Sequence, residues 1–382
     1  MTLWEQLLFL LIAFAVSFSI CGILIRSPNF LMDVPNYRSL HAEPVPRGGG
    51  MAFGLGFLVC LGGLLFLYYP ESLNQAMAAL FAGCILVYLL GLLDDALALP
   101  ALFRLALQTF IAFVLCRHGA PEKIHFFGLF ELYGWPALAV QVFWILTCIN
   151  LMNFLDGLDG LVGTLAILFS LTLGLLLWME PHTEILAEPP EIAAHLQQPV
   201  VYRVLAIAFF CLAAAILGFL FWNAPRARIF MGDGGSYLLG FVFGFPGIIL
   251  PYDPGMIYTE PRAEVTVLWT SPYYMDHLMI LILWFPLLLD PAMTIVRRLF
   301  AGENVLLAHR EHLFQLFRRN GWSIYRITAL YVVSFLAILP LILMKMAGHQ
   351  FFSILLALSG LGILYVLFFL YMYRRLLSNA LF

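Results

Sequence analysis

Charged side chains are scarce in this chain. Asp, Glu, Lys and Arg make up 11% of its 382 residues, whereas apolar residues make up 63% and aromatic residues 15%. Ordinary soluble domains carry roughly 25% charged residues. The mean hydropathy of +0.96 therefore indicates an integral membrane protein and excludes a large domain outside the membrane.

Three further features are missing. The net charge of -3, with Lys and Arg dispersed, offers no basic face, which excludes nucleic acid as a partner. The six cysteines form no CxxC pair and are expected to be buried and unpaired. No basic region precedes the apolar run at 3–25, so we expect a first transmembrane helix there and not a cleaved signal peptide.

Apolar windows bounded by Pro, Gly or charge predict about 11 transmembrane helices in an all-α fold. No internal repeat is evident, so residues 1–382 are expected to form one polytopic domain. The predicted spans are 3–25, 49–69, 75–93, 101–116, 135–149, 161–179, 200–222, 235–251, 277–296, 323–344 and 351–373.

The distribution of positive charge predicts the orientation of these spans. If the connection after the first span faces the cytoplasm, 14 of the 19 Lys and Arg residues lie on the cytoplasmic side. This orientation predicts a periplasmic N-terminus and a cytoplasmic C-terminus in a bacterial inner membrane.

Four polar clusters interrupt the apolar pattern, and each follows an odd-numbered span. They are Asp94 with Asp95, the group Asn150, Asn153, Asp156 and Asp159, Asp233 alone, and His309 with His312. Charge beside lipid is costly and usually functional. Since all four connections would emerge on the cytoplasmic side, the clusters are expected to form one site facing the cytoplasm.

The residue types in these clusters favour phosphoryl transfer. The five aspartates form an oxygen-only set that suits Mg²⁺, or Mn²⁺ as an alternative, and disfavours zinc. Asp233 lies between glycines, which let backbone amides approach a phosphate, and is the expected metal ligand; a helix cap is the alternative. Arg310 beside the histidines would add positive charge.

Three motifs resemble those of the polyprenyl-phosphate N-acetylhexosamine-1-phosphate transferase superfamily, glycosyltransferase family 4. They are the pair Asp94-Asp95, the Asn-x-x-Asn-x-x-Asp-Gly-x-Asp-Gly series from Asn150 to Gly160, and Phe-Met-Gly-Asp-x-Gly-Ser from Phe230 to Ser236. The resemblance implies Mg²⁺-dependent transfer of a sugar-1-phosphate from a UDP-sugar to undecaprenyl phosphate, with release of UMP.

The same resemblance implies roles for the clustered residues. Asp94, Asp95 and Asp156 would be catalytic. Asp94 and Asp95 would position or deprotonate the lipid phosphate or coordinate metal, and a covalent aspartyl phosphate on Asp94 or Asp156 is the alternative. Substrate binding is expected from Asn150, Asn153, Asp159, His309, Arg310 and His312. The partners are membrane lipids, and relatives often form dimers, so a homodimer stays open.

Two details concern the branch of the superfamily. Ala98 stands where the cell-wall phospho-N-acetylmuramoyl-pentapeptide transferase has Lys, and the core His309-Arg310-Glu311-His312 departs from His-x-His-His. Both disfavour the cell-wall transferase. The stretch from Ser39 to Gly50, together with His309-Arg310-x-His312, looks more like transferases that initiate O-antigen or related surface polysaccharides. A transporter or flippase of a phosphorylated lipid is the alternative class, and it predicts inverted repeats with polar groups near the midplane. The sugar is not fixed by the motifs.

Overall fold

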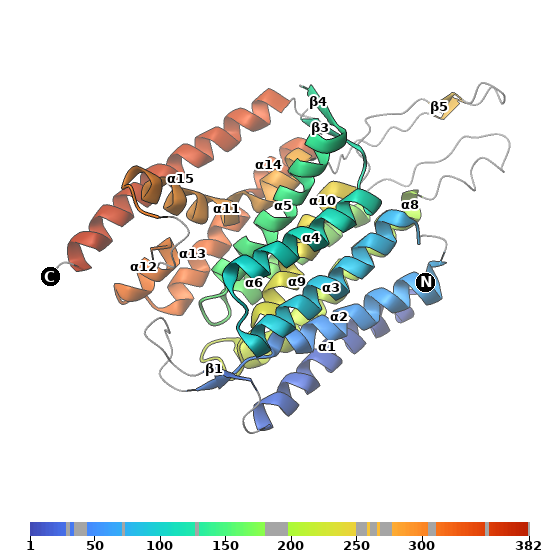
Figure 1. The fold of residues 1–382 in the computed structure, drawn as a ribbon, viewed down its shortest axis with the longest axis horizontal. Helices are drawn as coiled ribbons and strands as arrows, with labels where there is room; N and C mark the ends of the chain where they lie inside the picture. The colour runs from blue at the N-terminus through green and yellow to red at the C-terminus, as the bar shows by residue number, and fades with distance from the viewer. Residues whose placement is uncertain are drawn as a thin grey trace.

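The computed structural model describes residues 1–27, 31–33, 44–70, 73–126, 130–179, 198–249, 258–259, 266–267, 277–304, 311–347 and 351–380. Helices dominate these residues (Figure 1). They are α1 (Leu3–Arg26), α2 (Gly49–Gly63) with a π-helical turn at Leu64–Tyr68, α3 (Gln75–Leu97), α4 (Ala101–Gly119), α5 (Gly134–Leu155), α6 (Leu161–Met179), α8 (Gln198–Asn223), α9 (Asp233–Gly244), α10 (Pro246–Ile249), α11 (His277–Phe300), α12 (Leu313–Arg319), α13 (Ile324–Leu336), α14 (Leu339–Met346) and α15 (Phe351–Ala380).

Strands are short and form three antiparallel pairs in the described residues. β1 (Met32–Asp33) pairs with β2 (Val45–Pro46), β3 (Lys123–Phe126) with β4 (Phe130–Tyr133), and β5 (Tyr258–Thr259) with β6 (Thr266–Val267). An isolated bridge between Arg47 and Phe230 joins the segment before α2 to the segment before α9. In the described residues, these two-stranded pairs lie in the connections between helices and form no larger sheet.

The predicted all-α membrane fold is confirmed. Among the described residues, ten helical segments are long and apolar enough to cross a membrane, with α13 and α14 counted as one. The eighth predicted span, 235–251, corresponds to α9 and α10, which have 12 and 4 residues and together fall short of a regular span. Eleven spans and the orientation of the termini stay predictions.

Helix α9 lies at the centre of one group of helices. All of its residues from Gly234 to Gly244 are buried, and it packs against α2, α3 and α5. A helix that is buried on every side carries apolar residues all round, and this accounts for Tyr-Leu-Leu-Gly-Phe-Val-Phe between 237 and 243. Because α9 begins with Asp233, it places this acidic residue at one end of the bundle.

Glycines let the backbones around α9 approach closely. A Cβ added at Gly91 of α3 would lie 2.4 Å from the carbonyl oxygen of Asp233, and one added at Gly50 of α2 would lie 2.2 Å from the nitrogen of Gly235. Neither position has room for a side chain. The start of α9 is therefore enclosed by backbone from two neighbouring helices.

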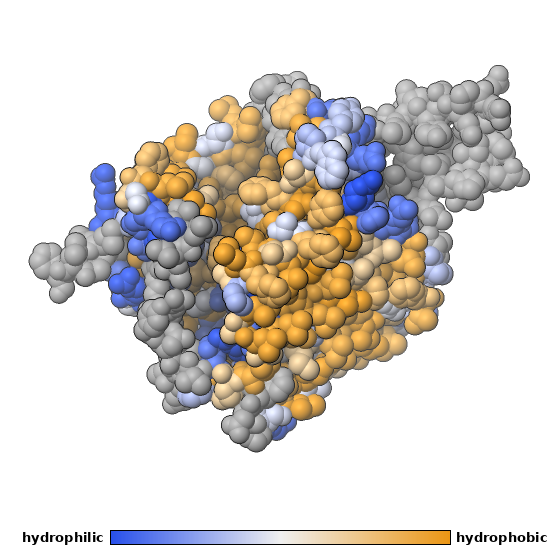
Figure 2. Space-filling model, viewed as in Figure 1, coloured by the Kyte–Doolittle hydropathy of each residue, from blue (hydrophilic) through white to orange (hydrophobic). Residues whose placement is uncertain are grey.

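The C-terminal helices α11 to α15 lie to one side of α5 and α6, whereas α1, α2 and α8 lie on the other side (Figure 1). Hydrophobic side chains cover most of the visible flank of the molecule, and hydrophilic ones gather toward its ends (Figure 2). The same view is hollowed between the α4–α5 face and the α11–α15 helices. All six cysteines are buried and unpaired, as predicted.

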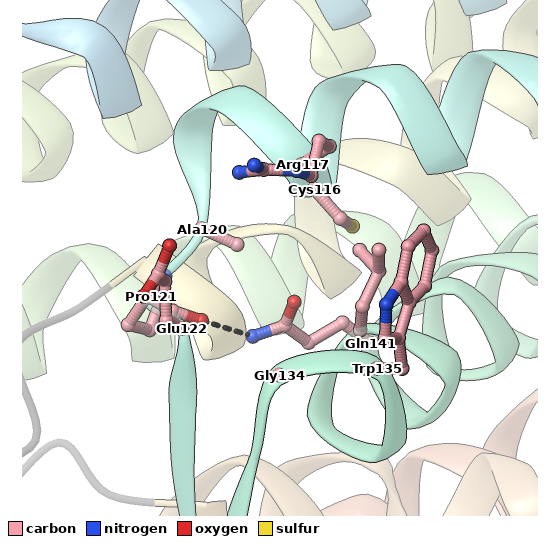
Figure 3. A pocket seen from close by; sticks show the side chains of 9 residues that line it. Cys116, Arg117, Ala120, Pro121, Glu122, Gly134, Trp135 and Gln141 are labelled. Atoms are coloured by element: carbon pink, nitrogen blue, oxygen red, sulfur yellow. Dashed lines mark hydrogen bonds between the residues drawn. The ribbon is translucent and has the colours of Figure 1, made fainter.

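A cavity of about 180 Å³ lies where α4 ends and α5 begins (Figure 3). Arg117, Glu122 and Trp135 contribute to its lining, and the Gln141 amide donates a hydrogen bond of 2.8 Å to the carbonyl oxygen of Pro121. Since α4 begins close to Asp94 and runs away from it, this cavity lies at the end of the bundle opposite the aspartates.

The close packing at Gly91 predicts a measurable cost. Gly91→Ala is expected to lower the free energy of unfolding by about 1–3 kcal/mol, because its Cβ would press on the backbone of Asp233. Gly360→Ala in α15 is the control, since nothing lies within 4 Å of that Cβ, and it should be neutral or stabilising by up to about 1 kcal/mol. Unfolding in detergent followed by helical circular dichroism measures both; equal effects would contradict the packing argument.

Candidate active site

Asp95 of α3 holds the first turn of α9. Its two carboxylate oxygens accept hydrogen bonds of 2.9 and 3.0 Å from the backbone amides of Asp233 and Gly234. The first amides of a helix have no partner within the helix and carry partial positive charge. The Asp95 carboxylate gives these amides a hydrogen-bond acceptor and places a negative charge at the positive end of the helix. Its hydrogen bonds join the paired-aspartate motif to the Phe-Met-Gly-Asp motif.

Asp94 connects three other groups and is only 3% exposed. One oxygen accepts from the Leu99 amide at 2.9 Å; the other accepts from the Arg104 guanidinium at 3.0 Å and from the Tyr237 hydroxyl at 2.7 Å. Ala98, in the left-handed region with φ 49°, turns the chain so that α4 brings Arg104 back beside α3. Arg104 also lies 4.0 Å from Asp233, which places a cation at the acidic cluster.

Asn153 of α5 completes the contact with α9. Its amide nitrogen donates to the Asp233 carboxylate at 2.6 Å and to the Ser236 hydroxyl at 3.1 Å. These bonds join the second and third sequence motifs. Asn150, one turn earlier, donates instead to Gln108 of α4 at 3.0 Å and to the Leu146 carbonyl oxygen, so it contacts the α4–α5 packing and not α9.

The loop after α5 carries the remaining two aspartates. Asp156 directly follows α5 and is half-buried. Asp159 accepts a hydrogen bond of 3.0 Å from the Ala227 amide, and the Gly160 amide donates to Asn223. Asp159 therefore stabilises the 224–232 connection that leads into α9.

Burial, and after it the repulsion between neighbouring carboxylates, disfavours ionisation of two of the acidic residues. Burial together with the charges of Asp233 and Asp95 raises the pKa of Asp156 to about 8. Burial together with Asp95 and Asp94 raises the pKa of Asp233 to about 7, although Asn153 and Arg104 act in the opposite direction. Both carboxyls would ionise more readily if a cation were bound between them.

The donor set fits a hard divalent cation that is completed by substrate. Among the described residues, no three His, Cys, Asp or Glu side chains converge as a complete metal site. Mg²⁺ usually binds one or two protein carboxylates, with water and substrate phosphates supplying the rest of its octahedron. Asp233 and Asp156, whose ionisation is suppressed first by burial and then by neighbouring carboxylates, suit this arrangement.

His312 reaches the same end of the bundle from the C-terminal helices. Its ring stacks against Phe154, with centroids 6.2 Å apart, and against Phe314 at 6.0 Å. A Cβ at Gly157 would lie 3.1 Å from Phe314, so α12 contacts the loop that carries Asp156. Burial lowers the pKa of His312 to about 4, which leaves the ring neutral at neutral pH.

The structure thus brings the first three predicted clusters together: Asp95 and Asn153 both bond to the first turn of α9, which carries Asp233. It places His312, from the fourth cluster, beside them. His309 and Arg310 lie outside the described residues. Sequence reasoning gave no role to Arg104 or Tyr237. Tyr237 follows Asp233 by four residues in α9, a spacing that puts both on one helix face and could have indicated it.

Comparison with known proteins finds similarity over the part of the chain that carries this site. Residues 77–250, which contain all three acidic motifs, match a family model described as "Glycosyl transferase family 4". The chain is 26% identical over 359 residues to a probable undecaprenyl-phosphate N-acetylglucosaminyl 1-phosphate transferase of Bacillus subtilis (strain 168), covering 90% of this chain and 87% of the relative.

Two other relatives align with 77% of this chain, and each alignment covers 70% of the relative's own length. One is the undecaprenyl-phosphate alpha-N-acetylglucosaminyl 1-phosphate transferase of Escherichia coli (strain K12), 27% identical over 303 residues. The other is the decaprenyl-phosphate N-acetylglucosaminephosphotransferase of Mycobacterium tuberculosis (strain CDC 1551 / Oshkosh), 28% identical over 308 residues. Over its acidic motifs, which assemble around α9, the chain is thus similar to glycosyl transferase family 4 and to transferases of N-acetylglucosamine-1-phosphate to polyprenyl phosphates.

Proposed function

We propose that this protein transfers N-acetylglucosamine-1-phosphate from UDP-N-acetylglucosamine to undecaprenyl phosphate. The observation that carries the proposal is the assembly of Asp94, Asp95, Asn153 and Asp233 around the first turn of α9. The sugar and the lipid are those in the names of the Bacillus subtilis and Escherichia coli relatives. The products are undecaprenyl diphosphate N-acetylglucosamine and UMP.

The reaction exchanges one phosphoanhydride bond for another. An oxygen of the lipid phosphate attacks the phosphorus that bears the sugar, and the bond from this phosphorus to the bridging oxygen breaks, so that UMP leaves with the electron pair. The lipid phosphate is largely ionised at neutral pH, so no strong base is required. Both oxygens of Asp94 already accept hydrogen bonds, which favours direct attack over a covalent intermediate on this residue.

Residues of α4, α5, α9, the loop after α5 and the start of α12 would hold the diphosphate and the acceptor. Arg104 offers a partly exposed guanidinium 4.0 Å from Asp233, where it would neutralise phosphate oxygens. Mg²⁺, with Mn²⁺ as an alternative, would bind Asp233 and Asp156 and stabilise the charge that develops on the phosphates. Asn153 fixes the orientation of Asp233, and His312 would contact the sugar or the diphosphate from α12.

The long isoprenoid of the acceptor fits an apolar approach to this site. Exposed apolar side chains flank Arg104 on α3 and α4, among them Leu97, Leu102 and Phe103. The hollow between the α4–α5 face and the α11–α15 helices (Figure 2) lies beside these helices. The lipid tail would stay in the membrane while its phosphate meets Arg104.

The charge distribution supports an inner-membrane location with the site facing the cytoplasm, where UDP-sugars are made. The transferase is favoured over a transporter because the acidic motifs gather at one end of the bundle. Catalytic roles of Asp94, Asp95 and Asp156, an O-antigen branch and a homodimer stay predictions.

The proposed activity predicts the effect of removing one carboxylate. Purified protein with UDP-N-acetylglucosamine, undecaprenyl phosphate and Mg²⁺ should release UMP, and Asp233→Asn should lower turnover by at least about a hundredfold while the protein stays folded. Glu122→Gln, at the opposite end of the bundle, is the control and should behave as wild type. UMP assays and mass analysis of the lipid product measure both. Near-normal turnover of Asp233→Asn would contradict the metal assignment.

The stabilisation of the protein by Mg²⁺ should depend on pH, and this can be measured without any turnover. The pKa values of Asp156 and Asp233 are raised in the folded state, so between pH about 4 and about 8 the folded protein binds more protons than the unfolded chain. In EDTA, where no cation is bound, the free energy of unfolding should therefore fall as the pH rises through this range. Added Mg²⁺ should therefore raise the melting temperature more at pH 8.5 than at pH 5.5, and Asp156→Asn should reduce this difference. A Mg²⁺ effect that is identical at both pH values would argue against these ligands.

A further inference from the structure

Asp290 is a carboxylate in the middle of α11 that the proposed reaction does not use. It is 0% exposed and lies in an apolar helix, directly before Pro291. From the sequence alone, it could either reach the site through a cavity or pair with Arg297 of the same helix face. Arg297 instead pairs with Glu303 and Glu311, so Asp290 has another role.

The Asp290 carboxylate joins three helices. One oxygen accepts a hydrogen bond of 2.8 Å from the amide of Leu313, the first residue of α12. The other oxygen accepts from the hydroxyl of Tyr331 in α13, which is itself buried. Thr294, one turn later in α11, donates to the backbone oxygen of Asp290 at 2.9 Å.

His312 occupies the residue just before α12, and its own side chain does not cap that helix. The Asp290 carboxylate performs the capping from α11 and lies 3.9 Å from the Nδ1 atom of His312. The preceding residue, Glu311, forms ion pairs with Arg297 and Arg298 at the end of α11. The chain is therefore fixed to α11 on both sides of His312.

This double attachment determines where the imidazole ring lies. The ring stacks against Phe154 and Phe314, next to the segment that carries Asn153 and Asp156. Phe154 belongs to α5, whereas the attachment to α11 belongs to the C-terminal helices. A shift of the first turn of α12 would move the ring away from α5 without altering the contacts of Asp95 or Asn153 with α9.

We propose that Asp290 is a positioning residue that sets the location of His312 in the active site through its hydrogen bonds to Leu313 and Tyr331. The inference rests on the proposed function, because His312 is assigned there to the sugar or the diphosphate. Asp290 touches no substrate in this arrangement and acts through the first turn of α12. Its hydrogen bonds, and not its charge, carry the effect.

Two substitutions separate hydrogen bonding from charge. Asp290→Leu is similar in size but leaves the Leu313 amide and the Tyr331 hydroxyl without their buried partner, and it should lower kcat by about ten- to a hundredfold. Asp290→Asn can accept from Leu313 and donate to Tyr331, so it should recover kcat to within about threefold of wild type. The KM for undecaprenyl phosphate should change by less than about threefold in both variants.

A double-mutant cycle tests whether Asp290 acts through His312. In the His312→Ala background, adding Asp290→Leu should change kcat by less than about twofold, because the ring that it positions is already absent. Gln141→Leu is the matched control: it also removes a buried polar side chain from a spanning helix, but at the opposite end of the bundle. It should leave kcat within about twofold of wild type in either background.

Amide exchange gives a reading that is independent of turnover. In Asp290→Leu, peptides covering 311–319 should exchange deuterium faster than in wild type, whereas those covering α9 should not change. Unchanged exchange at 311–319, losses that multiply in the double variant, or an Asp290→Asn protein as impaired as Asp290→Leu would each overturn the proposal. If wild-type protein releases no UMP, the proposed function fails while the exchange experiment still decides the attachment of α12.

Discussion

The first turn of α9 is the point on which the site depends, because several carboxylates must be held there despite their mutual repulsion. Asp95 offsets part of this cost by accepting two backbone amides at the positively polarised start of the helix. Gly91 and Gly50 permit the approach by leaving no side chain between the backbones. Asn153 and Tyr237 can then bond across α5, α9 and α3 only because the start of α9 is fixed.

The site receives its residues from two groups of helices. The acidic and amide side chains come from α3, α5, α9 and the loop after α5, which pack closely through glycine. His312 comes from the C-terminal group, which meets the first group mainly at α5 and α6. Residues that are far apart in the sequence therefore meet at one end of the bundle: the first group bears the acidic cluster, and the second places the neutral ring of His312 beside it.

The sequence was sufficient for the parts of this architecture that follow from hydrophobicity. Long apolar runs predict the spanning helices, and the parity of the spans predicts that Asp94, Asn153 and Asp233 share one end of the bundle. The partners themselves could not be predicted in this way, because they depend on the rotation and depth of each helix. Asp95 could not be assigned to the amides of α9 without knowing that Gly91 lets the two backbones touch.

Other features escaped the sequence for different physical reasons. The apolar window extends through 235–251, but α9 ends at Gly244, and the next helix in the described residues, α10, runs only from Pro246 to Ile249. The link from Asp290 to Leu313 spans a connection whose path no periodicity specifies. Asp159 bonds to Ala227 because two loops meet at the end of the bundle, and loop geometry is the least predictable part of such a chain.

The burial of all six thiols gives the native fold a chemical signature. Each sulfur lies in the interior of a helix bundle, so a maleimide dye finds no accessible nucleophile while the helices remain packed. Once the bundle separates, every cysteine becomes a labelling site. The protein thus carries an intrinsic fluorogenic reporter of its own unfolding, and no engineered probe is needed.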